Sequence, residues 1–162
     1  MFGGLKKLFG GKEGDVLLSP VPGKAIPMSE VNDPTFSQEI LGKGTAVIPS
    51  EGRIAAPADG EITMVFDTKH AISMNTSSGA ELIIHVGLDT VQLKGKYFTA
   101  HVKAGDQVKA GDLLLEFDLQ KIKDQGYDVT TPVIVCNSQA FPGIKCLAGM
   151  EVKALDKIIE LR

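Results

Sequence analysis

The sequence predicts an all-β fold, an antiparallel β-sandwich or barrel-sandwich with one or two short helical turns. The 162 residues include 18 glycines and 8 prolines, and this content favours short strands joined by tight turns over long helices. Clusters of turn-forming residues recur along the chain, at 19–23, 48–52, 58–60 and 77–79. The short apolar segments between them have the spacing of a sandwich or barrel. A chain of this length fits one compact domain.

The first 14 residues differ in character from the rest. Large apolar residues fall on helical spacing with lysines beside them: Met1, Phe2, Leu5, Leu8 and Phe9, and Lys6, Lys7 and Lys12. We expect residues 1–14 to be a flexible tail or a short amphipathic anchor with weak membrane-surface contact through Met1 to Lys12. The tail is the preferred interpretation because so short a helix is marginal in water. Residues 15–162 are expected to form a single domain.

Four segments of this domain are expected to be strands. They lie at 60–67, 71–75, 81–86 and 113–117. The sequence Val-Lys-Ala-Gly-Asp occurs twice, at 102–106 and 108–112. Both copies are expected to be turns, because glycine tolerates positive φ and an aspartate side chain can cap the turn.

Two segments are expected to be helical. Residues 118–125 have Asp118 as a cap and are followed by Gly126 as a stop. A shorter helical turn is expected at 36–41, after Asp33 and Pro34. Both are short, as the all-β prediction requires.

Composition restricts the environment and the partners. The net charge of −3 indicates no electrostatic attraction to nucleic acid. Cys136 and Cys146 lack the C-x-x-C spacing of a zinc or redox site. Cys136 ends the apolar run that begins at Pro132, so a buried structural thiol is expected there. No segment is long and apolar enough to span a membrane, and the chain is expected to be cytoplasmic with reduced thiols.

The histidines are the candidate reactive groups. His85 directly follows three apolar residues of an expected core strand, and Gly87 ends that run. The strand period of two places Phe66, Thr68 and His70 on one face of another segment. Thr68 could then fix the tautomer of His70 and leave the other ring nitrogen available. On composition alone, a structural role for each histidine is the default, and His101 is expected to be an ordinary surface histidine.

Residues 79–91 resemble, position for position, the signature of the glucose-type IIA domain of the bacterial sugar phosphotransferase system. That signature has a glycine, three apolar residues before histidine, an apolar-glycine-apolar triplet, and threonine followed by an aliphatic residue. The matching positions are Gly79, Leu82, Ile83, Ile84, His85, Val86, Gly87, Leu88, Thr90 and Val91. The resemblance extends from about Val16 onward, with landmarks at 19–20, 42–44, 57–60, 68–71, 93–95 and 116–118.

The resemblance implies a phosphocarrier built on an antiparallel β-sandwich with a shallow apolar depression. His85 matches the histidine that phosphorylated HPr phosphorylates, on Nε2, and that passes the phosphoryl group to a cysteine of a IIB domain. His70 matches the second catalytic histidine, and Thr68 matches the hydroxyl that orients it. The partner-docking rim is implied at Phe36, Ile40, Leu41, Phe66, Asp89 and Val91. No cofactor and no metal are expected, and the resemblance implies that a stand-alone member also binds regulatory targets when unphosphorylated.

Three alternatives remain open. Biotinyl and lipoyl carrier domains have related hairpins, but they need a lysine at an exposed hairpin tip within a short motif, and we find no convincing one. A zinc-dependent hydrolase of the LytM-like sandwich type would need a His-x-His pair, whereas His85 is followed by Val86 and Gly87. A purely regulatory binding module is the third.

The sequence leaves other properties undetermined. Glucose, N-acetylglucosamine, trehalose and β-glucosides are all compatible with it as transported sugars. The chain could be a free protein or part of a longer permease, and the Met1 start favours the first. The oligomeric state, the regulatory targets, and whether zinc can bridge His70 and His85 in a complex also stay open.

Overall fold

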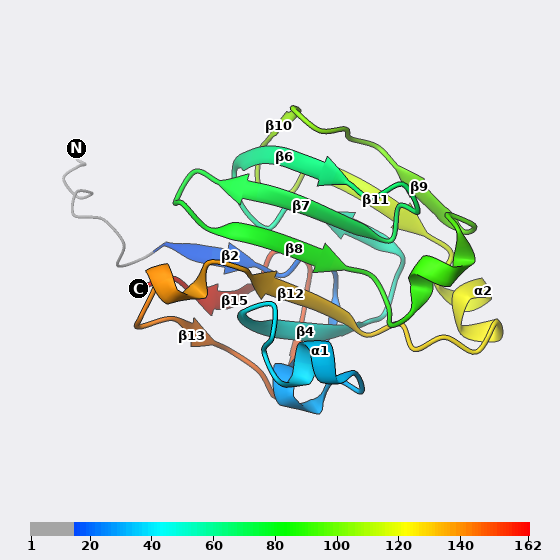
Figure 1. Ribbon diagram of the computed structural model, residues 1–162, viewed down its shortest axis with the longest axis horizontal. Coiled ribbons are helices and arrows are strands. Elements are labelled where there is room, and N and C mark those ends of the chain that lie inside the picture. The colour runs from blue at the N-terminus through cyan, green and yellow to red at the C-terminus, as the bar shows by residue number, and fades with distance from the viewer. Residues whose placement is uncertain (1–14) are drawn as a thin grey trace.

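The computed structural model describes residues 15–162, which fold as packed antiparallel sheets (Figure 1). The strands are β2 (Val16–Leu18), β3 (Gly23–Pro27), β4 (Lys43–Pro49), β5 (Arg53–Ala55), β6 (Gly60–Val65), β7 (Ala71–Thr76), β8 (Glu81–His85), β9 (Phe98–Ala100), β10 (Gln107–Val108), β11 (Leu113–Phe117), β12 (Thr131–Val135), β13 (Lys145–Cys146), β14 (Met150–Val152) and β15 (Lys157–Glu160). The helical elements are η1 (Met28–Glu30), α1 (Pro34–Ser37), η2 (Thr90–Leu93), α2 (Leu119–Asp124) and η3 (Ser138–Ala140).

The main sheet has eight strands in the order β10-β6-β7-β8-β12-β4-β3-β14. Two three-stranded sheets, β5-β11-β9 and β13-β15-β2, pack with it. The core between the sheets is formed by fully buried apolar side chains, among them Leu17, Ile54, Ile62, Ile72, Leu82, Ile84, Leu114 and Ile158. The predicted antiparallel all-β sandwich is therefore confirmed.

The alternation of side chains along strand β8 determines the direction of the His85 side chain. Leu82 and Ile84 are buried in the core, whereas Ile83 and His85 are only partly buried. Successive side chains of a strand point to opposite faces, so the two core residues direct His85 to the outer face. The strand is held on one side by β7 and on the other by β12, which makes it a rigid support.

The helical predictions are partly correct. The helix α2 begins after Asp118, whose carboxylate accepts a hydrogen bond from the Lys121 N–H, and Gly126 has φ of +90° just beyond its end. The prediction of a helical turn at 36–41 is wrong in its bounds. Asp33 caps α1 by accepting from the Thr35 N–H, and Pro34 supplies the first helical φ. The turn therefore starts and ends earlier, and Ile40 and Leu41 follow it.

The two repeated turns form as predicted, and a third copy accompanies them. The carboxylates of Asp106 and Asp112 accept hydrogen bonds from the N–H groups of Lys103 and Lys109. Asp156 does the same for the Lys153 N–H in the related sequence Val-Lys-Ala-Leu-Asp at 152–156. Leu155 stands there at φ of +73° where the other copies have glycine, and that substitution hides the repeat in the sequence.

The prediction for Cys136 needs correction. Cys136 follows the end of β12 and is half-buried, as is Cys146, and both thiols are free. Burial raises the pKa of the Cys136 thiol, with the Glu81 carboxylate as a second cause. Within 15–162, no helix has the length and apolarity to cross a membrane. The tail predicted at 1–14 lies outside the residues that the structure describes.

Candidate active site

Adjacent strands bring His70 and His85 together. β7 and β8 pair with Ala71 opposite His85, and the Val86 N–H donates to the His70 carbonyl at 2.7 Å. The two imidazole rings meet edge to face, with centroids 4.7 Å apart and planes at 83°. Two imidazoles thus share one small site at the end of a central strand.

Thr68 contacts His70, but not through the strand alternation that the sequence indicated. Residues 66–70 form the turn between β6 and β7, in which the Lys69 N–H donates to the Phe66 carbonyl and Lys69 has φ of +58°. This turn places the Thr68 hydroxyl 2.7 Å from Nδ1 of His70. Nε2 of His70 is the ring nitrogen that remains for other contacts.

The carbonyl of Gly87 selects the tautomer of His85. Nδ1 of His85 lies 2.7 Å from that oxygen, and because a carbonyl only accepts, Nδ1 must carry the proton. In the neutral ring the lone pair therefore resides on Nε2. Gly87 has φ of +81°, and a Cβ there would lie 2.5 Å from the Thr90 side chain. The Thr90 hydroxyl in turn donates to the Val86 carbonyl, so this turn requires glycine.

Both histidines are held neutral at physiological pH. Burial, followed by the proximity of His85, lowers the pKa of His70 from 6.5 to about 4, and its side chain is only 3% exposed. Burial also lowers the pKa of His85. The Gly87 hydrogen bond and the carboxylates of Asp33 and Asp89 oppose that shift. A neutral imidazole keeps the lone pair that a nucleophile needs.

The low pKa of His70 predicts a loss of stability in mild acid. The unfolded chain binds a proton near pH 6.5, whereas the folded chain does not until about pH 4, so stability falls as the pH drops between these values. Between pH 7 and pH 5, the wild type should lose about 2 kcal/mol more unfolding free energy than His70→Gln, whose side chain does not titrate. Urea unfolding of both proteins at the two pH values measures this. An equal loss of unfolding free energy in the two proteins would contradict the lowered pKa of His70.

The predicted rim residues divide into two groups. Phe36 is not exposed rim. It is 5% exposed and belongs to a second core cluster with Met28, Leu88 and Ile134, with its ring centroid 5.0 Å from that of His85. Phe66 is half-buried, and its ring lies 5.5 Å from that of His70. Phe36 therefore forms the floor beside His85, and Phe66 forms a wall beside His70.

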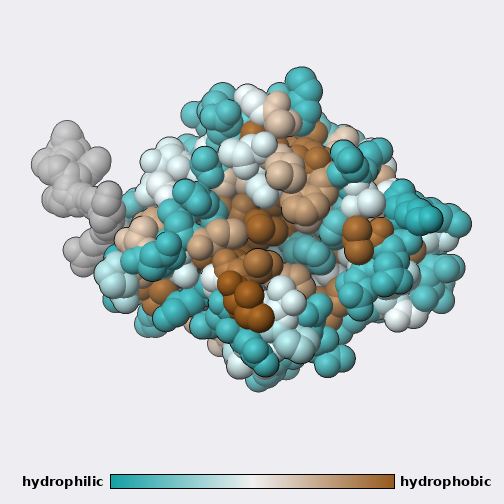
Figure 2. All heavy atoms as spheres, in the orientation of Figure 1, coloured by the Kyte–Doolittle hydropathy of each residue, from teal (hydrophilic) through white to brown (hydrophobic). Residues whose placement is uncertain are grey.

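The other rim residues are exposed, as an interaction surface requires. The exposed fractions are 66% for Ile40, 39% for Leu41 and 48% for Val91. Ile40 and Leu41 follow α1, which carries Phe36, and Val91 lies in η2, shortly after His85. Figure 2 shows hydrophobic side chains gathered along the middle of the face that carries β7, β8 and α1, with hydrophilic ones around them. Exposed apolar patches of this kind are usually binding surfaces.

Two carboxylates lie close enough to His85 to act on its charge. Asp89 is exposed at φ of +60°, immediately before η2, and Asp33 is the cap of α1. Both favour the protonated form of His85. Sequence reasoning identified Asp89 but assigned Asp33 only to the helix start. The sequence around Asp33 indicates that a helix starts there, but it does not indicate that this helix packs against β8.

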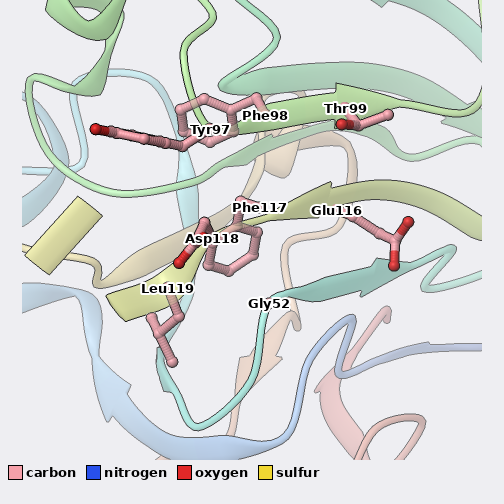
Figure 3. A pocket seen from close by; sticks show the side chains of 8 residues that line it. All are labelled: Gly52, Tyr97, Phe98, Thr99, Glu116, Phe117, Asp118 and Leu119. Atoms are coloured by element: carbon pink, nitrogen blue, oxygen red, sulfur yellow. The ribbon is translucent and has the colours of Figure 1, made fainter. Parts of the chain in front are cut away.

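A hollow of about 590 Å³ lies elsewhere, on the sheet that contains β9 and β11 (Figure 3). Its lining includes Tyr97, Glu116 and Asp118 but neither His70 nor His85. Figure 3 shows the Tyr97 hydroxyl and the Glu116 carboxylate pointing apart, so their polar atoms do not converge on one point. Glu116 instead lies 2.8 Å from Nε2 of the exposed His101, which confirms His101 as a surface histidine.

Within 15–162, no group of three or more histidine, cysteine, aspartate or glutamate side chains could hold a metal ion. The described residues therefore offer no support for the zinc-hydrolase alternative.

The chain is similar in sequence and in fold to known proteins. Residues 15–141 match the family described as the phosphoenolpyruvate-dependent sugar phosphotransferase system, EIIA 1. The glucose-specific EIIA component of Oceanobacillus iheyensis is 44% identical over 153 residues, which cover 92% of this chain and 93% of that one. The solved structure of glucose permease IIA from Mycoplasma capricolum matches with a TM-score of 0.81 and 33% identity, over 90% of this chain and 94% of that chain.

Longer relatives match as well. The β-glucoside-specific EIIBCA component of Dickeya chrysanthemi is 45% identical over 147 residues, which cover 91% of this chain. The same match covers only 23% of the relative, so the chain spans about a quarter of its length.

Proposed function

The chain belongs to the EIIA 1 family of the phosphoenolpyruvate-dependent sugar phosphotransferase system, and we propose that His85 is the residue on which it carries the phosphoryl group. The observation that carries this assignment is the hydrogen bond from Nδ1 of His85 to the Gly87 carbonyl. It leaves the Nε2 lone pair as the nucleophile, beside the ring of His70. The proposed donor is phosphorylated HPr, and the proposed acceptor is the cysteine of a IIB domain.

The reaction conserves the proton on Nδ1. Nε2 of His85 attacks the phosphorus of phosphorylated HPr, an N–P bond forms, and the N–P bond to HPr breaks. In the second step a cysteine thiolate of IIB attacks the same phosphorus, and the bonding pair returns to Nε2. Such transfers need chiefly in-line placement and stabilisation of charge. The apolar surroundings exclude water, which limits hydrolysis.

His70 is proposed to stabilise the phosphoryl group. When the Thr68 hydroxyl donates to Nδ1 of His70, the ring proton resides on Nε2 and can be donated to a phosphoryl oxygen. The backbone N–H groups of Gly87 and Leu88 already donate to the carbonyls of Thr130 and Asp128, so they are not available to the phosphoryl group. Asp89 and Asp33 would repel the phosphoryl group, so we propose that they pair with basic groups on the donor protein.

The experiment that tests the function is reconstitution. The protein is incubated with phosphoenolpyruvate, enzyme I and HPr, and mass spectrometry follows under alkaline conditions that preserve phosphohistidine. The expected product carries one phosphoryl group on His85. Phosphorylation at a different residue, or none with active enzyme I and HPr, would contradict the proposal.

We infer that residues 15–162 form one phosphocarrier domain that works in the cytoplasm, where phosphoenolpyruvate is available. The transported sugar is selected by the membrane components. Relatives are glucose-specific in one case and β-glucoside-specific in another.

The exposed rim predicts a shared docking surface for HPr and IIB. Leu41→Asp should weaken both complexes about tenfold or more, because a charge would enter an apolar contact. Leu155→Asp is the matched control, since Leu155 in the turn at 152–156 is exposed to a similar extent, 40% against 39%, and contacts Ser19 and Gly111 instead of the histidine site. Isothermal titration calorimetry with each partner measures the effect. Two variants that fold and bind both partners like the wild type would contradict this docking surface.

A further inference from the structure

An apolar groove of about 410 Å³ lies beside the histidine site, between the end of β6 and the chain from β9 onward. Met64, Val65 and Phe66 form one wall, and Ala100 and Val102 belong to the other. Met64 is 49% exposed, which is unusual for a large apolar side chain on a strand. The groove and the histidine site share Phe66, whose ring also lies against that of His70.

The β6 wall presents an unpaired strand edge to this groove. β7 pairs with β6 along its length, whereas on the other side β10 pairs with Gly60 and Glu61, and residues 105–106 just before β10 pair with Ile62. The open part of this edge therefore begins after Ile62. The Phe66 N–H donates to the Ala71 carbonyl across the β6–β7 pair. Hydrogen-bonding positions alternate along an antiparallel strand, so Val65 directs its N–H and C=O away from β7. A bulge between Ile62 and Met64 separates this part of β6 from its first half.

The opposite wall also presents an unpaired edge. β9 is at the end of its sheet and pairs only with β11. The His101 N–H donates to the Leu114 carbonyl, and the Tyr97 carbonyl accepts from the Asp118 N–H. By the same alternation, Ala100 directs its N–H and C=O away from β11. Val65 and Ala100 thus bring two open edges to one groove.

We propose that this groove binds an extended peptide segment of a partner protein, which adds a β-strand beside Val65 and Ala100. Unpaired strand edges are templates for such strand addition, and the neighbouring side chains then select the sequence. The lining favours apolar residues on the peptide. The charges beside the groove balance, since Lys69 and Lys103 are offset by Asp67, which also lines it, and by Asp106, which pairs with Lys103. The peptide is therefore selected by its apolar side chains and its backbone, and not by charge.

The position of the groove couples the peptide to the carrier chemistry without placing it in the reaction. A bound strand would contact Phe66, the side chain that packs on His70. The peptide contacts neither Phe36 nor the Gly87 turn that orients His85. Peptide binding therefore does not require His85, and His85→Ala should still bind the peptide. Failure of peptide binding would leave the phosphocarrier function intact, and failure of phosphorylation would leave peptide binding intact.

The test selects ligands from random nonapeptides displayed on phage, using the full chain as bait. The strongest binders are then synthesised and added to the ¹⁵N-labelled protein. We expect alternating apolar residues in the selected peptides, and amide hydrogen exchange at Val65 and Ala100 at least tenfold slower when the peptide is bound. The exchange readout identifies strand addition, because a side-chain contact alone would not protect these two backbone groups.

Two matched variants complete the test. Met64→Glu places a charge in the apolar groove and should weaken binding at least tenfold, whereas Ile48→Glu makes the same change at an exposed apolar residue outside it and should have no effect. A selection that yields no binders would overturn the inference. Binders that leave Val65 and Ala100 unprotected, or that bind Met64→Glu as well as the wild type, would also overturn it.

Discussion

His85→Ala, incubated with phosphoenolpyruvate, enzyme I and HPr, is expected to carry no stable phosphoryl group. The substitution removes the only nucleophile that the site orients, since Nε2 of His85 has its lone pair fixed by the Nδ1 hydrogen bond to Gly87. His70 does not replace it. Burial and its neighbour hold His70 neutral, and the Thr68 hydroxyl engages its Nδ1, but no backbone carbonyl fixes the lone pair on Nε2. Intact-mass spectrometry under alkaline conditions measures the loss.

His101→Ala is the matched control for this experiment. His101 is exposed and paired with Glu116, so its removal should leave phosphorylation at the wild-type level. A His85→Ala protein that is folded, as judged by circular dichroism, and labelled to the wild-type extent would disprove the assignment. Complete loss of phosphorylation in both variants would indicate that the substitutions damage HPr recognition, and would also contradict the assignment of His85.

The arrangement of β8 could be predicted from sequence because it depends on local periodicity. Alternation buries Leu82 and Ile84 and turns His85 outward, and the position of Gly87 marks the turn that follows. The contact of Thr68 with His70 was expected for the wrong reason. Alternation along a strand suggested it, whereas the turn at 66–70 makes it. Residues two apart are brought to the same side by both conformations, so the pattern could not distinguish them.

Features that depend on tertiary packing could not be predicted in this way. Phe36 is predicted at an exposed rim, but η1, α1 and strands β3, β4 and β12 of the main sheet enclose it in a separate cluster. The electrostatic effect of Asp33 on His85 follows from the same docking of α1 against β8. No periodicity within residues 33–37 encodes which strand they will contact, because that contact is set by side chains far along the chain.

His70→Gln is expected to separate the two half-reactions. The variant should accept the phosphoryl group from HPr at close to the wild-type rate, but pass it to the IIB cysteine about 100-fold more slowly or worse. Glutamine retains a donor at this position, but it cannot carry a positive charge or transfer a proton. Rapid-quench measurement of each half-reaction, with purified HPr and IIB, gives the two rates.

The asymmetry follows from the charges in each step. In the first step the nucleophile is the neutral ring of His85, so a neutral donor at residue 70 is sufficient. In the second step a thiolate approaches a phosphoryl group that already carries about −1.5 to −2 charge, and the two repel. The phosphoryl group on His85 lies next to His70, since the rings are 4.7 Å apart, and a nearby negative charge raises the pKa of an imidazole. His70 can then become cationic when the charge is needed, although its pKa is about 4 without the phosphoryl group.

Thr68→Val keeps the histidine and removes only the hydroxyl at Nδ1, so it should slow the second step less than His70→Gln does. Equal slowing of both half-reactions in His70→Gln, or none in the second, would show that His70 serves packing and not charge.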